Sequence, residues 1–316
     1  VFFTNSGTES CELAVKMARK YWYEKGHTAK FEIIAFEGAF HGRSSAAIAA
    51  TNSEKLVKGF GPMLPGFKQV DWANSDHLEA AINQNTAAII IEPIQGEGGD
   101  NHFSKEFLIK LKELSLENDF LLIHDEVQTG IGITGKMWAH QHFCEPSCHF
   151  SCITHCKAIE PDIISFGKKT QVCGVFAGDR LNEVENHVFH ESSRINSTFG
   201  GNLVDMVRFT IYAEIIQQEK LVDNARENGK YLLGKLRTME SNFENKVSNS
   251  RGKGLFCAFD LDSSTSRDKL IYNMEKEGAI ILGCGHKSVR FRPHLNISKD
   301  EIDLACDMLI KSIKKL

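Results

Sequence analysis

Short apolar segments alternate with amphipathic segments along most of this chain, and that alternation limits the fold more than any other feature. The amphipathic segments repeat their apolar residues at helical spacing, as Ala14, Ala18 and Trp22 do. Apolar strands separated by helices predict a parallel sheet that is covered on both faces. The expected strands lie at 1–3, 32–36, 87–93, 120–126, 162–169 and 174–178, and the clearest helices at 6–22 and 105–119.

The last third of the chain carries a second pattern. A long helical stretch over 202–240 leads into the order strand, helix, strands, helix. We therefore expect an α/β protein in which a mostly parallel sheet flanked by helices is followed by a smaller α+β domain. The boundary is placed near residue 220, which gives a large domain over 1–220 and a small domain over 221–316.

Composition and charge exclude several kinds of protein. With 42% hydrophobic residues, 25% charged residues and a net charge of −4, the chain is unsuited to nucleic acid or an anionic membrane. No apolar stretch approaches the ~18 residues of a membrane helix. The nine cysteines are odd in number and mostly scattered, which favours reduced thiols in the cytoplasm. Because the chain starts at Val1 in mid-strand, we expect an N-terminally truncated large domain.

Charged residues follow three of the expected strands, where a buried strand should avoid them. Glu92 ends one strand, Asp125 and Glu126 end another, and Lys168 and Lys169 end a third. In an open parallel sheet the carboxyl ends of the strands meet at one edge, and ligands bind there. Acids and a lysine at that edge would neutralise one another around a crevice.

A loop of small residues at 2–9, FFTNSGTE, precedes the first helix. Free N–H groups at a helix N-terminus bind phosphate, although Ser6 or Thr8 would serve equally well as a plain helix cap. Likewise, a lysine after a strand is usually a solvated charge. The combination matches a phosphorylated aldehyde cofactor, which needs a lysine for a Schiff base, an acid that keeps the pyridine nitrogen protonated, and a phosphate cradle.

Several motifs, in order, resemble those of class III aminotransferases of fold type I, which use pyridoxal 5′-phosphate (PLP). The resemblance implies PLP as cofactor, an amino donor with 2-oxoglutarate as acceptor, and a homodimer with its active sites at the subunit interface. The matching motifs are TNSGTE, GAFHGR, EPIQGEGG, DEVQTG, SFGKK, STFGGN and VRFRP, and they cover nearly the whole chain.

The resemblance assigns the cofactor site position by position. Lys168 resembles the Schiff-base lysine and proton shuttle, with Lys169 as a surface lysine beside it. Asp125 resembles the partner of the pyridine nitrogen, and Gln128 a neighbour of the ring hydroxyl. The remaining cofactor contacts implied are Ser6, Gly7 and Thr8 around the phosphate, Phe40 against the ring, and Thr198, which reaches the phosphate from the other subunit.

Substrate contacts follow from the same resemblance. Arg43 resembles a clamp for the substrate carboxylate, a role that suits a planar bidentate guanidinium. Arg290 resembles the arginine that binds the second carboxylate of 2-oxoglutarate, and Glu97 the glutamate that covers this arginine when an amine-ended substrate is present. Asn196 is a further expected substrate contact. The catalytic residues implied are thus Lys168, Asp125 and Glu97.

The two ends of the chain resemble different subfamilies. Residues 1–90 resemble acetylornithine aminotransferases, and the remainder resembles L-lysine 6-aminotransferases, with KKTQVCG in place of a glycine-rich segment. The later part receives more weight because it lies closer to the substrate. The expected reaction moves the terminal amino group of L-lysine to 2-oxoglutarate, giving glutamate and 2-aminoadipate 6-semialdehyde. An acetylornithine- or ornithine-type ω-aminotransferase is the alternative.

A cysteine- and histidine-rich stretch departs from the family pattern. Cys144, Cys148, Cys152 and Cys156 recur every four residues, and cysteine with histidine is a ligand set of zinc. The spacing differs from that of the common zinc modules and Pro146 interrupts it, so an inserted surface loop is favoured and no metal site is assigned. The insertion and the truncated start keep open a catalytically silent protein with an aminotransferase fold.

Overall fold

The computed structural model describes residues 1–143 and 159–316, so the cysteine-rich stretch at 144–156 lies outside the described residues. The chain divides into two compact units. The large unit consists of Val1–Pro93, His102–Gln128 and the described part of His140–Ile211. The small unit consists of Ile94–Asn101, Thr129–Ala139 and Tyr212–Leu316. The boundary expected near residue 220 stays a prediction.

The large unit contains a seven-stranded sheet in the order β1-β9-β8-β7-β4-β2-β3. The neighbours from β3 to β8 pair in parallel, and β9 is antiparallel to both β8 and β1. The mostly parallel sheet predicted from the alternating pattern is therefore confirmed. Its strands are β1 (Phe2–Thr4), β2 (Glu32–Phe36), β3 (Phe67–Val70), β4 (Thr86–Ile91), β7 (Leu121–Asp125), β8 (Ile163–Phe166) and β9 (Cys173–Ala177).

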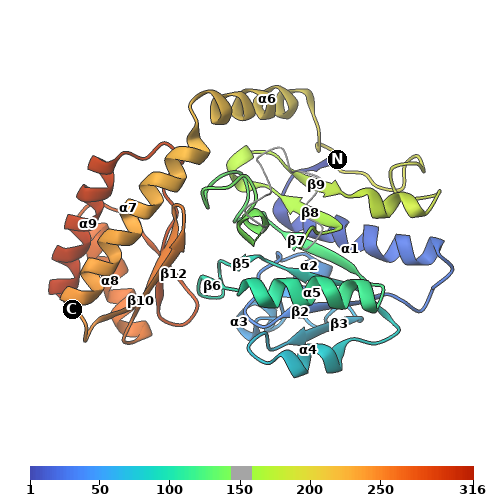
Figure 1. Ribbon diagram of the computed structural model, residues 1–316, viewed down its shortest axis with the longest axis horizontal. Coiled ribbons are helices and arrows are strands. Elements are labelled where there is room, and N and C mark those ends of the chain that lie inside the picture. Colours follow the sequence, from blue (N-terminus) through green and yellow to red (C-terminus); the bar gives the residue numbers. More distant parts are fainter. Residues whose placement is uncertain (144–158) are drawn as a thin grey trace. The chain divides into compact units, whose positions relative to one another are not determined.

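Helices cover both faces of this sheet (Figure 1). Because successive side chains of a strand point to opposite faces, Ile33 of β2 packs in the cluster formed by α1, while its neighbour Ile34 packs in the cluster formed by α5. The indole of Trp22 donates to the backbone oxygen of Ala87 at 2.7 Å and fixes α1 against β4. The helices are α1 (Gly7–Glu24), α2 (Ser45–Thr51), α3 (Glu54–Val57), α4 (Ser75–Ala81), α5 (Lys105–Glu117) and the 3-10 helices η2 (Lys168–Thr170) and η3 (Asp179–Glu183).

The small unit is built on a four-stranded antiparallel sheet in the order β10-β11-β13-β12. Its core joins this sheet to three helices, and the last helix begins with a capping box formed by Ser298 and Glu301. The α+β character predicted for the end of the chain is confirmed. Its elements are α7 (Leu221–Asn242), β10 (Val247–Lys253), β11 (Phe256–Leu261), α8 (Ser264–Lys276), β12 (Leu282–Cys284), β13 (Ser288–Phe291) and α9 (Lys299–Lys314).

The helical stretch expected over 202–240 forms two helices, α6 (Leu203–Gln218) and α7. They are separated at Lys220, whose φ of 50° lies in the left-handed region and ends the regular helix. A short ribbon of β5 (Ile94–Gln95) and β6 (Asn101–His102) and the 3-10 helix η1 (Ala139–Phe143) complete the described elements. None of the helices in residues 1–143 and 159–316 combines the length and apolarity that a membrane crossing requires.

Candidate active site

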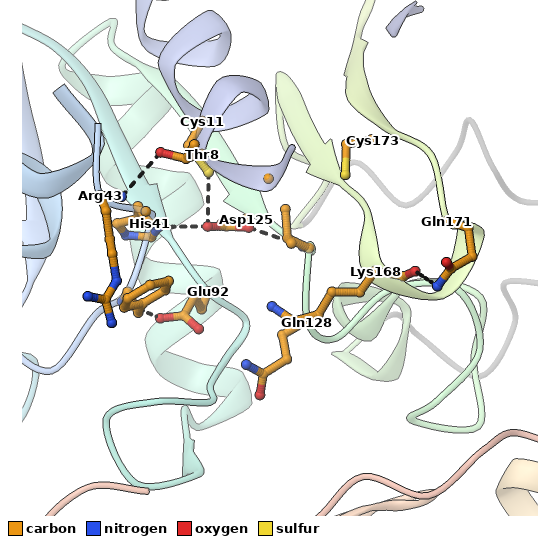
Figure 2. Close-up of a pocket in the computed structure, with 14 residues that line it drawn as sticks. Thr8, Cys11, His41, Arg43, Glu92, Asp125, Gln128, Lys168, Gln171 and Cys173 are labelled. Carbon is orange, nitrogen blue, oxygen red and sulfur yellow. Dashed lines mark hydrogen bonds and ion pairs between the residues drawn. The ribbon is translucent and has the colours of Figure 1, made fainter. Parts of the chain in front are cut away.

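The charged ends of β4, β7 and β8 lie around one cavity of about 510 Å³ in the large unit. Glu92, Asp125 and Lys168, which the sequence places at three strand ends, all line it. Figure 2 shows the Lys168 side chain extending into this pocket. The other lining residues are Gly7, Thr8, Cys11, Phe40, His41, Gly42, Arg43, Val127, Gln128, Gln171 and Cys173.

Asp125 ends β7 with a side chain that is almost fully buried and densely hydrogen-bonded. Its Oδ2 accepts the Cys11 thiol at 3.1 Å and lies 2.8 Å from Nδ1 of His41 (Figure 2). Its Oδ1 accepts the Val127 backbone N–H at 3.0 Å and the Ser165 hydroxyl at 3.1 Å. Burial alone raises the pKa of this carboxyl, but the hydrogen bonds, first that of His41, outweigh burial and hold the pKa below its ordinary value. Asp125 is therefore a buried carboxylate that stays ionised.

Sequence reasoning did not assign the three side chains that hold Asp125 in this state. His41 stands inside the GAFHGR motif, so a signal was present, but it received no role. Cys11 and Ser165 lie in an ordinary helix and an ordinary strand, where nothing in the pattern marks them. Burial raises the pKa of the Cys11 thiol well above its ordinary value, so Cys11 is a protonated donor to the carboxylate.

The N-terminus of α1 faces the cavity through Gly7 and Thr8. The first N–H groups of a helix have no intrahelical acceptor, so this end is suited to an anion. A side chain at Gly7 would lie 2.8 Å from Val127, so glycine keeps the helix end close to the loop after β7. Ser6 does not line the cavity; its hydroxyl accepts the Glu9 backbone N–H at 3.3 Å and caps α1. Ser6 thus takes the plain capping role that its sequence left open.

A loop between β2 and α2 forms the wall that carries Phe40 and Arg43. The Thr8 hydroxyl accepts the Arg43 backbone N–H at 3.2 Å, which ties this loop to α1. Gly42 has a φ of 131°, and a Cβ at that position would overlap the Thr8 hydroxyl, so only glycine fits without strain. The Phe40 backbone N–H donates to the Glu92 carboxylate at 2.9 Å. The Arg43 guanidinium is exposed and lies 6.0 Å from the centre of the Phe40 ring.

Lys168 and Lys169 have different environments, although they are neighbours in sequence. The Lys169 ammonium donates to the backbone oxygen of Gln128 at 2.7 Å and so is occupied in holding the loop after β7. Lys168 stands at the start of η2 with a φ of 54°, and its carbonyl accepts the Gln171 side-chain amide at 3.1 Å. Within the described ranges, no hydrogen bond or ion pair involves the Lys168 ammonium. The lysine that lines the cavity is therefore the one whose amine is available for chemistry.

Glu97 and Arg290 belong to the small unit and form an ion pair. The distance between Nη1 of Arg290 and Oε1 of Glu97 is 2.6 Å. The Arg290 side chain is 11% exposed and that of Glu97 is 38% exposed. The structure thus brings together the two residues that were predicted to act as a pair.

Asn196 and Thr198 are exposed and do not line the cavity formed by their own large unit. Ser197 between them is buried, and its hydroxyl accepts the Asn5 amide at 2.6 Å and donates to the Glu9 carboxylate at 3.0 Å. This contact fixes the segment beside the start of α1. The role of Thr198 in the other subunit and that of Asn196 toward substrate stay predictions.

The chemistry of the cavity fits PLP. Asp125 supplies an ionised carboxylate for a pyridinium nitrogen, Lys168 supplies an available primary amine, and the α1 N-terminus supplies N–H donors for a phosphate. A mostly parallel sheet with these groups at the carboxyl ends of its strands defines a PLP-dependent transferase of fold type I.

Comparison with known proteins gives the family. The model for aminotransferase class-III matches residues 1–313, and the chain belongs to this family of PLP-dependent enzymes. An L-lysine-epsilon aminotransferase of Mycobacterium tuberculosis is 40% identical over an alignment of 337 positions, which covers 96% of this chain and 70% of that protein. An acetylornithine aminotransferase of Aquifex aeolicus is 40% identical over 309 residues, which cover 98% of this chain and 75% of that protein.

The solved structures agree with this assignment. A lysine aminotransferase from M. tuberculosis superimposes with a TM-score of 0.91 at 37% identity, covering 99% of this chain and 75% of that one. A transaminase from the marine bacterium Virgibacillus gives a TM-score of 0.90 at 25% identity, with 99% and 74% coverage. The predicted family, fold type and cofactor are confirmed, and relatives from both predicted subfamilies are found.

Proposed function

We propose that this chain is an L-lysine 6-aminotransferase that moves the terminal amino group of L-lysine to 2-oxoglutarate and releases glutamate and 2-aminoadipate 6-semialdehyde. The observation that carries the proposal is that the Lys168 amine and the ionised Asp125 carboxylate share one cavity. The choice of lysine rests on the similarity to several L-lysine-epsilon aminotransferases. An acetylornithine- or ornithine-type enzyme is the second candidate, because an acetylornithine aminotransferase is equally identical to this chain.

Each residue proposed to contact the cofactor has a separate role, which follows from its charge and its position. When bound, PLP supplies an aldehyde that takes up the donor's amino group and a ring that withdraws electrons from the reacting carbon. Asp125 keeps a proton on the pyridine nitrogen, because a buried carboxylate stabilises an adjacent cation. Lys168 would hold the cofactor through its aldehyde, and its Nζ would carry the proton that the reaction moves. Gln128 would contact the ring hydroxyl and Phe40 would pack on the ring, since both line the cavity.

The residues proposed to hold the phosphate and the substrate act by binding alone and take no part in proton transfer. The first N–H groups of α1, at Gly7 and Thr8, would hold the phosphate, with Ser6 fixing the helix end. Arg43 holds the α-carboxylate of the donor, since its guanidinium is exposed at the wall of the pocket. Asn196 is a further contact for the donor.

Glu97 and Arg290 let one site accept two substrates of opposite charge. With a cation-ended donor, Glu97 neutralises Arg290, as their 2.6 Å contact allows. With 2-oxoglutarate, the second carboxylate of the acceptor replaces Glu97 on Arg290. Glu97 is able to leave because it is 38% exposed, so water solvates its charge once the pair opens.

The proposed enzyme is a homodimer. Helix α6 exposes an apolar surface that a monomer would leave in water, and its burial against a second copy would stabilise association. In this dimer Thr198 of the partner subunit reaches the phosphate, which accounts for its position away from the cavity of its own chain. The most exposed apolar residues of α6 are Leu203 (83%), Val204 (73%), Val207 (61%) and Ile211 (49%).

We place the enzyme in the cytoplasm. The support comes from thiols: the cysteines of the described segments are free, and four of them, Cys11, Cys257, Cys284 and Cys306, are buried. A reducing compartment keeps thiols in this free state.

The experiment that tests the proposal measures turnover of four donors against 2-oxoglutarate: L-lysine, N-acetylornithine, ornithine and 4-aminobutyrate. We expect lysine to be turned over fastest, and turnover of N-acetylornithine alone would overturn the choice of donor. Lys168→Ala should abolish both the yellow absorbance of the PLP-loaded protein and its activity. Lys169→Ala is the matched control and should retain the absorbance, since the Lys169 ammonium donates to the Gln128 backbone and does not line the cavity.

The same spectra test the alternative of a catalytically silent protein. A wild-type chain that cannot be loaded with PLP, and that remains colourless after reconstitution, would favour that alternative. A chain that binds PLP through Lys168 and turns over none of the four donors would leave the family assignment intact and reject the proposed substrate.

A further inference from the structure

Three ionisable side chains gather at the end of β7 outside the cofactor cavity. They are His124, Glu126 and His140, and their ligand atoms all lie within 4.8 Å of one another. His124 is 1% exposed, Glu126 is fully buried, and the side chain of His140 in η1 is 12% exposed. The proposed reaction uses none of them.

Strand alternation separates this cluster from the cofactor site. Successive residues of a strand point to opposite faces, so His124 and Glu126 flank Asp125 but point away from its side. The packing agrees, since Ile123 lies in the cluster formed by α1, whereas Leu122 lies in the cluster formed by α5. His124, two residues after Leu122, therefore belongs to the α5 side of the sheet.

His124 is a polar residue placed in an apolar core without a visible reason. Within residues 1–143 and 159–316, neither of its ring nitrogens has a hydrogen-bond partner, although both are buried. Such groups normally have a partner, because an unpaired buried donor or acceptor destabilises the fold. A neutral imidazole carries a lone pair on one ring nitrogen, which makes it a common metal ligand.

The neighbours of His124 supply the rest of a ligand set. Oε1 of Glu126 accepts the His140 backbone N–H at 3.0 Å and lies 2.9 Å from Nδ1 of the same residue. The rings of His124 and His140 have centroids 5.6 Å apart. Two imidazoles and one carboxylate are the protein ligands of many zinc sites, and their ligand atoms lie about 2.0–2.1 Å from the ion. Small rotations of the three side chains would bring their ligand atoms to that distance from one ion. The nearby Lys112 ammonium, which would oppose a cation, lies 3.8 Å from Asp162.

We propose that His124, Glu126 and His140 bind one divalent transition-metal ion of the zinc type, which links the end of β7 to η1. The ion satisfies His124 and holds the strand end from the face opposite Asp125. It is structural, because it lies outside the cavity in which the amine and the carboxylate meet. All three ligands lie among the described residues, outside the cysteine-rich stretch.

The test uses the full PLP-loaded chain, stripped of metal with a chelator and then titrated with Zn²⁺ in a calorimeter. We expect one high-affinity ion per chain, lost in both His124→Leu and His140→Ala and retained in the exposed-residue control His77→Leu. Retention of the ion in His124→Leu, or its absence from the wild type, would overturn the proposal. Cobalt distinguishes the sources of the ligands, because thiolate ligands add intense near-ultraviolet bands that histidine and carboxylate do not. A variant with serine at Cys144, Cys148, Cys152 and Cys156 should still bind one ion.

Thermal unfolding provides a second, independent readout. Without metal, His124→Leu should be at least as stable as the wild type, because leucine continues the apolar run and removes two unpaired nitrogens. With saturating Zn²⁺, the wild type should melt at a higher temperature and His124→Leu should not move. An equal rise in both proteins would show that the ion binds elsewhere and would overturn the assignment.

Discussion

Replacing Glu97 by glutamine removes one negative charge from the small unit while keeping the size of the side chain. Glu97 occupies the guanidinium of Arg290 at 2.6 Å, and a ligand carboxylate that binds Arg290 must displace it. The variant therefore separates the two substrates: it removes a competitor of 2-oxoglutarate and uncovers a positive charge that faces an amine-ended donor. We expect the KM for 2-oxoglutarate to fall and the KM for lysine to rise.

The size of both effects follows from exposure. Partly exposed ion pairs contribute about 0.2–1 kcal/mol, because water screens them. Arg290 is only 11% exposed, which places this pair near the upper end of that range despite the exposure of Glu97. Since about 1.4 kcal/mol corresponds to tenfold, a contribution of about 1 kcal/mol predicts roughly fivefold changes in opposite directions. The fold should be unaffected, because glutamine still donates and accepts hydrogen bonds.

Single-turnover kinetics measure each half-reaction separately through the absorbance of the bound cofactor. Lysine is mixed with the PLP-loaded enzyme for the first half-reaction, and 2-oxoglutarate with the amino-loaded enzyme for the second. Glu97→Asp is the matched control, which keeps the charge but shortens its reach, and it should give smaller changes of the same sign. If Glu97→Gln alters both half-reactions in the same direction, or neither, Glu97 does not act as an exchangeable cover for Arg290.

Three further predictions concern other parts of the chain. Asp125→Asn should lower kcat at least about a hundredfold while PLP stays bound, because unpairing a buried charge costs about 3–5 kcal/mol; an unchanged kcat would contradict the role of Asp125. Gly42→Ala should lower the free energy of unfolding by about 1–3 kcal/mol in urea titrations, since its φ of 131° and the adjacent Thr8 hydroxyl leave no room for a methyl group, and full stability would show that the loop adjusts. Leu203→Glu combined with Val207→Glu should convert the dimer to a monomer in sedimentation experiments, whereas a charge reversal at the exposed Lys230 should leave the dimer intact. A dimer that persists in the Leu203→Glu, Val207→Glu variant would place the interface elsewhere.

The alternating pattern predicts the sheet and the edge at which the site lies, because both depend on periodicity and on which residues end the strands. Glu92, Asp125 and Lys168 follow three strands that are neighbours in the sheet, so parallel pairing alone brings them to one cavity. The pattern does not predict what surrounds Asp125. Its partners His41, Cys11 and Ser165 lie 84, 114 and 40 positions away along the chain. Local periodicity carries no information about contacts over such separations.

The choice between Lys168 and Lys169 shows the same limit at shorter range. Both follow β8 and have the same chemistry, so only the resemblance to a family distinguishes them in the sequence. The structure distinguishes them by geometry, since the left-handed backbone at Lys168 directs its amine into the pocket while Lys169 bonds to the loop after β7. A left-handed φ in a residue with a long side chain depends on tertiary contacts that a sequence pattern does not contain.

The end of β7 explains why a buried strand finishes in a run of ionisable groups. His124, Asp125 and Glu126 point alternately to opposite faces, so each face of the sheet receives its own polar group. On the α1 side, four donors stabilise one carboxylate that the proposed chemistry requires to be ionised. On the α5 side, Glu126 is paired with His140, and His124 has no hydrogen-bond partner in the part of the chain that the structure describes. A shift of β7 by one residue would exchange the two sets and place either His124 or Glu126 where Asp125 is needed. The register of β7, fixed by its parallel pairing with β4 and β8, is therefore the structural condition on which both sites depend.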